Sequence, residues 1–83
     1  MTTITVKLFG PQARLAQKRE VLAACASDTP TAGEVLEAVG EACPILAEHL
    51  DNSKLAVNHE LVTSTDPVRT GDEVAVIGML GGG

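Results

Sequence analysis

The 83 residues are enough for one domain with a modest hydrophobic core and too few for two such domains. Hydrophobic residues make up 45% of the chain, which excludes a disordered protein, and no apolar run is long enough to span a bilayer. The net charge of -5, with one Phe and no Tyr or Trp, argues against a nucleic-acid partner, whose phosphates need cations and whose bases stack on aromatic rings. We therefore expect a cytoplasmic protein that binds other proteins, with no nucleic-acid or membrane partner.

The cysteine and histidine residues predict neither a disulfide nor a metal site. Cys25 and Cys43 lie in apolar segments and form no CxxC pair, so we expect both thiols to be reduced and buried. His49 and His59 have no metal-ligand spacing to each other or to the cysteines. No metal is expected.

The first quarter of the chain predicts two paired strands. Apolar and polar residues alternate in Ile4-Thr5-Val6-Lys7-Leu8, the period of a strand with one buried face. Gly10-Pro11 ends this pattern, and the polar residues 12–19 predict a connection or a short helical turn. Residues 20–26 are then expected to form the hairpin partner, although their alanines also suit a helix.

The middle of the chain predicts one main helix. Thr31 and Glu34 have the spacing of a capping box, in which each side chain satisfies a free backbone N–H of the other residue. The apolar stripe of the helix is expected to be core and its glutamates solvated. These residues are Val35, Leu36, Val39 and Cys43 in the stripe, and Glu34, Glu37 and Glu41 on the other side.

Pro44 cannot continue that helix but can begin another one. Residues 44–50 therefore predict a separate short turn, which is expected to carry Ile45, Leu46 and Leu50 inward.

The last third of the chain predicts two short strands and a final central strand. Residues 55–57 and 61–62 are expected to pair around Asn58-His59-Glu60, with Asn58 in the left-handed conformation. Asp66-Pro67 and Thr70-Gly71-Asp72 are turn signals on either side of Val68. The apolar run in residues 73–77 predicts a strand buried on both faces, hence a central one. A sheet packed on one helix is an α+β domain.

The chain ends in Gly81-Gly82-Gly83. Backbone without Cβ atoms can enter a slot too narrow for other residues, and the segment from Gly78 to Gly83 could extend roughly 20 Å, at about 3.3–3.6 Å per residue. Such a tail suits delivery of the terminal carboxylate to another protein's active site. The alternative is a frayed chain end, where small residues are common.

Together these features resemble a known family. Phe9 with Arg14 after the first strand is followed by AVNHELV from Ala56, GDEVA from Gly71 and the glycine end. The combination is similar to sulfur-carrier proteins of the ubiquitin-like β-grasp fold, and most of all to their MoaD branch, the small subunits of molybdopterin synthase. The resemblance implies a mixed sheet packed on one main helix, with a β-grasp domain over residues 1–77 and a flexible tail over residues 78–83 that enters partner active sites.

The resemblance also implies the chemistry. Gly83 would carry an acyl-adenylate and then a thiocarboxylate, while Gly81 and Gly82 give the tail its access. The chain itself would bind no cofactor and hold no catalytic site; ATP and magnesium would be used by a MoeB-like activating enzyme. The sulfur would pass to a pterin precursor on a MoaE-like large subunit in molybdenum cofactor biosynthesis.

Partner contacts are implied only by analogy. The family's apolar interface corresponds here to Phe9, Leu61, Ile77, Met79 and Leu80. For Phe9, Leu61 and Ile77 the alternative is a place in the core. Arg14 could pair with an acidic group of a partner or be a solvated cation, and Asp72 with Glu73 is expected to be a charged turn.

Other functions stay open from the sequence. The MoaD branch usually has a proline-rich run before its glycines, whereas this chain has Gly78-Met79-Leu80. Carriers of the ThiS type, and carriers that supply sulfur to cysteine or transfer RNA, remain alternatives. So do a protein modifier, in which Gly83 acylates a lysine, and a binding module whose glycines do no chemistry.

Overall fold

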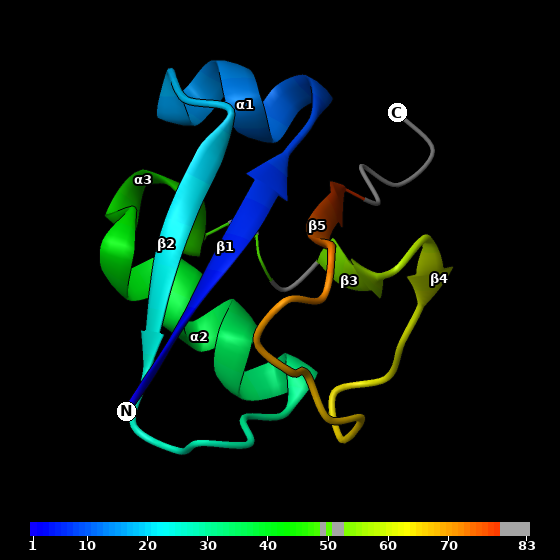
Figure 1. Cartoon of the computed structure of the whole chain (residues 1–83). Helices are drawn as coiled ribbons and strands as arrows, with labels where there is room; N and C mark the ends of the chain where they lie inside the picture. The colour runs from blue at the N-terminus through cyan, green and yellow to red at the C-terminus, as the bar shows by residue number, and fades with distance from the viewer. Residues whose placement is uncertain (49, 51–52, 79–83) are drawn as a thin grey trace.

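The computed structural model describes residues 1–48, 50 and 53–78 (Figure 1). The elements in chain order are β1 (Thr2–Leu8), α1 (Gly10–Ala16), β2 (Glu20–Cys25), α2 (Ala32–Ala42), α3 (Pro44–Ala47), β3 (Ser53–Val57), β4 (Glu60–Leu61) and β5 (Val74–Gly78). The succession agrees with the expected α+β fold. None of the described helices is long and apolar enough to cross a bilayer.

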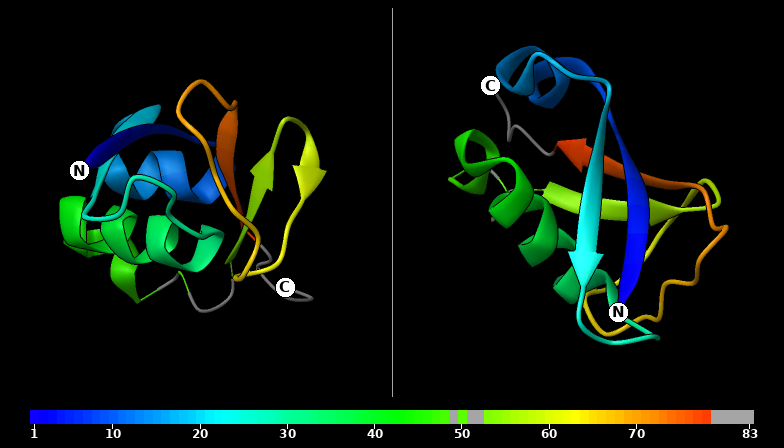
Figure 2. Two further views of the ribbon diagram at one scale, coloured as in Figure 1. Left: turned by 60° about the horizontal axis from the view of Figure 1, so that its bottom comes forward. Right: turned by 60° about the vertical axis from the view of Figure 1, so that its left-hand side comes forward.

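The strands form one mixed sheet in the order β2-β1-β5-β3-β4. β1 is parallel to β5, and the other neighbouring pairs are antiparallel. The helices lie together on one side of this sheet, as the two further views make clear (Figure 2). β5 is therefore the central strand, as the sequence predicts, and it ends at Gly78 rather than at the expected Ile77.

The alternation in β1 and β2 decides which side of the hairpin packs against the helices. Ile4, Val6 and Leu8 are at most 3% exposed, and Thr5 and Lys7 between them are exposed. The pairing of β1 with β2 runs from Thr2 opposite Cys25 to Lys7 opposite Glu20. Because directly opposite residues share a face, the buried side chains of both strands enter the same core.

α2 begins at the capping box that the sequence predicts. The Glu34 amide donates to Thr31 Oγ1 at 3.3 Å, and the Thr31 amide donates to Glu34 Oε1 at 3.1 Å. The same end of the helix is tied to the loop before β5, because the Ala32 amide donates to the Asp66 carbonyl at 2.8 Å. Val35 and Val39 are fully buried against the sheet.

The short helical turn that the sequence offers after the first strand is α1, and one expectation for α3 needs correction. Within α1, the polar side chain of Gln12 is 2% exposed and donates through Nε2 to Ser53 Oγ at 3.5 Å. In α3, Leu46 is fully buried but Ile45 is 55% exposed, so the predicted inward position of Ile45 is wrong; Leu50, which follows α3, packs against the core as expected. Successive residues of a helix point about 100° apart, and in α3 this difference puts Leu46 in the core and Ile45 at the surface.

The prediction that β5 is buried on both faces is also wrong. Val74 and Val76 are at most 1% exposed on the helix side, whereas Ala75 and Ile77 are only half-buried on the other. The apolar run in this strand therefore serves two different surfaces. One surface is the core, and the other is the candidate site.

Candidate functional site

A groove crosses the outer face of the sheet, the side opposite the described helices. Its volume is about 370 Å³. We call it the sheet groove; it is lined by Lys7, Phe9, Ala56, His59, Leu61, Glu73, Ala75 and Ile77.

The floor of the sheet groove follows from the strand register. Lys7 lies opposite Ala75, Ala75 opposite Ala56, and Ala56 opposite Leu61, which makes one row across β1, β5, β3 and β4. Directly opposite residues of neighbouring strands have their side chains on the same face of the sheet. The two central members of the row are alanines, so the middle of the sheet face is low and its edges stand higher.

The walls are the apolar side chains that the family resemblance implies. Phe9 is 55% exposed and Leu61 is 59% exposed, so the alternative that these two residues are core is wrong. Ile77 is half-buried and lies between them in the sheet order. The structure thus brings three residues from distant parts of the sequence onto one surface.

Backbone geometry fixes the position of Phe9. It follows β1 directly and is the N-cap residue of α1, with an extended backbone conformation. The next residue, Gly10, has φ +54, which glycine adopts without strain. The chain turns away here, and the ring is left at the rim between the sheet groove and a second hollow of about 440 Å³ next to α1.

A charged group forms the other rim of the sheet groove. Glu73 Oε2 lies 2.8 Å from His59 Nε2, and Glu73 Oε1 lies 3.6 Å from Lys7 Nζ. The Glu73 carboxylate is thus shared by two cationic or hydrogen-bonding side chains. All three side chains are at least 44% exposed, so their mutual attraction is screened and a partner can compete for them.

The tight turn between β3 and β4 holds this rim in place. Asn58 and His59 have φ values of 52° and 71°, so the turn has two residues, and Glu60 belongs to β4 rather than to the expected three-residue connection. Asn58 Oδ1 accepts from the Glu73 amide at 3.0 Å, and the Asn58 amide donates to the Glu73 carbonyl at 2.7 Å. The sequence identifies Asn58 as a turn residue, but it gives no sign that His59 and Glu73 would meet.

Other predicted site residues lie elsewhere. Arg14 is exposed on α1 and does not line the sheet groove; within the described part of the chain it has no ion pair. Asp72 takes part in the turn, where its Oδ2 accepts from the Arg69 amide at 2.9 Å. Met79, Leu80 and the three terminal glycines lie outside the described residues.

The two cysteines are not exposed nucleophiles. Cys25 and Cys43 are free and buried, as expected. Burial raises the pKa of the Cys25 thiol, and the charges of Glu34 and Glu41 raise it further, so this thiol is a poor nucleophile. No cluster that could hold a metal ion occurs among residues 1–48, 50 and 53–78, which leaves His49 aside. The sheet groove, with its apolar walls and charged rim, is suited to the binding of a protein surface.

Comparison with known proteins assigns the chain to a family. The sequence profile of the ThiS family matches residues 6–83. A search of curated protein sequences gave no match.

Several solved structures share the fold. SAMP1 from Haloferax volcanii has a TM-score of 0.83 at 26% identity, with 99% of this chain and 100% of that chain covered. A Pyrococcus furiosus protein described as subunit 1 of molybdopterin converting factor has a TM-score of 0.78 at 20% identity, covering 94% and 98%. A complex of subunits 1 and 2 of molybdopterin-converting factor from Helicobacter pylori contains a chain with a TM-score of 0.64 at 22% identity, covering 99% and 100%. These likenesses confirm the expected ubiquitin-like β-grasp fold.

Proposed function

Because the chain belongs to the ThiS family, we propose that it is a sulfur carrier whose C-terminal Gly83 is charged by one enzyme and discharged on another. The observation that carries this proposal is the place of the sheet groove. It lies beside the end of β5, and the sequence continues from Gly78 to Gly83 without another domain between them. A partner that covers the groove therefore holds the domain close to where the tail begins.

Gly83 is the reacting residue in this scheme. Its α-carboxyl group, with a pKa of roughly 3.3–3.7, is an anion at neutral pH and a poor electrophile. An activating enzyme supplies ATP and magnesium; a carboxylate oxygen attacks the α-phosphorus, pyrophosphate leaves, and an acyl-adenylate forms. Sulfur supplied by a donor as hydrosulfide then attacks the acyl carbon; AMP leaves, the S–H proton is lost, and a thiocarboxylate forms.

The remaining residues deliver this group. Gly81 and Gly82 present no side chains to the walls of an active-site channel. Phe9, Leu61 and Ile77 contact the partner, since partly exposed aromatic and aliphatic side chains at the centre of a patch contribute most of the binding energy. Met79 and Leu80 extend this apolar contact along the tail.

The finer proposal is the molybdopterin pathway. Here the chain is the small subunit of a synthase, and its thiocarboxylate donates sulfur to a pterin precursor bound by a MoaE-like large subunit. The fold shared with a chain of the Helicobacter pylori complex of subunits 1 and 2 supports a two-subunit arrangement of this kind. Charging would fall to a MoeB-like enzyme, and both enzymes would use the same sheet groove in turn.

Intact-mass measurement tests the carrier function. The full chain is incubated with an activating enzyme, ATP, magnesium and a sulfur donor, and we expect the mass to rise by the difference between sulfur and oxygen. Deletion of Gly83, or Gly82→Trp, should abolish this change, while Leu22→Ala, on the outer face of β2 and away from the groove, should preserve it. Charging of the Gly83 deletion would contradict the proposal.

A second candidate function is protein modification. The likeness to SAMP1, small archaeal modifier protein 1, favours it. In that case the acyl-adenylate passes to a lysine amine, with an amide bond formed and AMP released. Adducts between Gly83 and lysine residues, found by peptide mass spectrometry in place of a thiocarboxylate, would establish this function over the carrier.

A further inference from the structure

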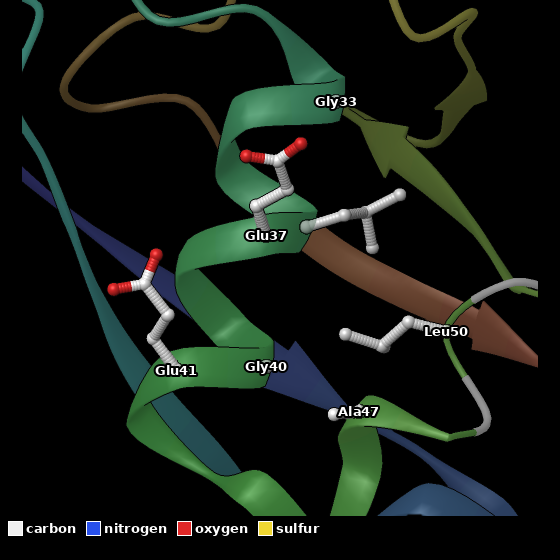
Figure 3. A pocket seen from close by; sticks show the side chains of 7 residues that line it. Gly33, Glu37, Gly40, Glu41, Ala47 and Leu50 are labelled. Carbon is white, nitrogen blue, oxygen red and sulfur yellow. The ribbon is translucent and has the colours of Figure 1, made fainter.

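A second groove lies in the helix layer, away from the sheet groove. It has a volume of about 550 Å³, within the range of ligand sites. We call it the helix groove; its α2 residues are Gly33, Leu36, Glu37, Gly40 and Glu41, and Leu50 faces them. Figure 3 shows the Leu50 side chain extending toward α2, with Gly40 opposite and Ala47 below.

Two glycines hollow out this side of α2. A Cβ on Gly40 would lie 3.1 Å from Leu50 Cδ1, and a Cβ on Gly33 would lie 3.1 Å from the Ser64 carbonyl oxygen. The close approach of other chain segments therefore explains why residues 33 and 40 are glycines. As a result, positions 33 and 40 of α2 contribute no side chain to the space beside Leu36 and Leu50. Both leucines touch the core but remain partly exposed.

The charges along the groove are unfavourable in the free protein. Glu37 and Glu41 are one helical turn apart and lie on the same side of α2 (Figure 3). Like charges at this spacing repel, and Glu41 also lies near the negative end of the helix dipole, in a last turn that has no basic residue. Neither carboxylate has an ion-pair or hydrogen-bond partner among the described residues.

The chain has few cations with which to relieve this repulsion. Its six Lys and Arg residues include none in α2 and none along the helix groove. Four of them, Lys7, Arg14, Lys18 and Arg19, lie in β1, α1 and the connection to β2. Both carboxylates are exposed, so a positive charge on another molecule can pair with them.

We propose that the helix groove binds a short segment of another protein, in which a lysine or arginine next to an apolar side chain pairs with Glu37 and Glu41. The apolar side chain fills the space between Leu36 and Leu50. Nucleic acid does not fit, because the carboxylates repel phosphates. Since the sheet groove is on the opposite face, such a protein could hold the carrier while its tail serves an enzyme.

The probe is a synthetic hexapeptide of alternating lysine and leucine, acetylated and amidated at its ends. It is titrated into the full ¹⁵N-labelled chain, and backbone amide shifts are followed. We expect the largest shifts at Gly33, Gly40 and Ala47. A peptide with glutamate in place of lysine, and one with serine in place of leucine, should both bind at least about tenfold more weakly.

Matched variants test whether the carboxylates of Glu37 and Glu41 bind the peptide. E37Q/E41Q should weaken binding of the lysine–leucine peptide about 3- to 10-fold, because each exposed ion pair contributes up to about fivefold in affinity. E48Q/E60Q makes the same change in net charge at exposed residues that do not line the groove, and it should change affinity less than about twofold.

Three results would overturn the proposal. One is a set of shifts centred on Phe9 and Leu61 rather than on α2, and another is equal binding by E37Q/E41Q and the wild-type chain. The third is concentration-dependent self-association in sedimentation that E37Q/E41Q abolishes, which would assign the groove to a second copy of this chain. Charging of Gly83 should be unaffected by the peptide, so failure of this proposal is separate from failure of the carrier function.

Discussion

Truncation of the ring that forms one wall of the sheet groove, Phe9→Ala, should weaken partner binding while the chain remains folded. A fully buried aromatic side chain covers about 150–250 Å². Because Phe9 is 55% exposed, about 110 Å² is left for a partner to cover, or about 2.7 kcal/mol at ~25 cal/mol per Å². Since binding recovers only part of such an area term, we expect the affinity to fall about 10- to 100-fold.

The assay is the rate of ATP-dependent charging of Gly83 as a function of carrier concentration. Phe9→Ala should raise KM about 10- to 100-fold and leave kcat within about twofold, because the tail that reacts is unchanged and only ground-state docking is lost. The part of Phe9 that is already covered contributes about 1–2 kcal/mol to folding, so urea denaturation must show that the variant is still folded.

Leu22→Ala is the matched control. Leu22 is 62% exposed on the outer face of β2, and it does not line the sheet groove. This variant should lose a similar amount of folding stability without any change in KM. If Leu22→Ala raised KM as much as Phe9→Ala, or if Phe9→Ala left KM unchanged, the sheet groove would not be the docking surface.

Three further predictions concern the fold. Leu46→Ala should lower the free energy of unfolding by about 2–5 kcal/mol because Leu46 is fully buried. Ile45→Ala, at a residue 55% exposed, should lower it by less than about 1 kcal/mol. Urea denaturation measures both values, and equal values would contradict the described orientation of α3. Thr31→Ala should cost about 1 kcal/mol through loss of the α2 cap, and an unchanged Tm would argue against that role. Burial raises the pKa of the Cys25 thiol, so above roughly pH 8.5 the folded chain binds more protons than the unfolded chain and stability should fall as pH rises. Cys25→Ala should reduce this fall, and a pH slope identical to that of the wild-type chain would refute the assignment.

Local patterns in the sequence were enough to predict the helices, strands and turns. The alternation of Ile4, Val6 and Leu8, the capping pair of Thr31 and Glu34, and the turn residue Asn58 each act over a few neighbouring residues. Backbone geometry and side-chain hydrogen bonds at that range do not depend on the rest of the fold. The sequence therefore determined the order of strands and helices along the chain and the identity of the terminal residues.

Only the tertiary structure decided which apolar residues are core and which are surface. The sequence shows that Ile77 and Ile45 are apolar, but its periodicity does not show whether another element covers their side chains. The register across four strands places Ala75 and Ala56 under the sheet groove, and it brings Glu73 to His59 and Lys7. Likewise, the helix groove exists because α3 and the Ser64 loop approach Gly40 and Gly33. Each of these surfaces is made by segments far apart in the chain, and their contacts depend on packing, which no local sequence pattern encodes.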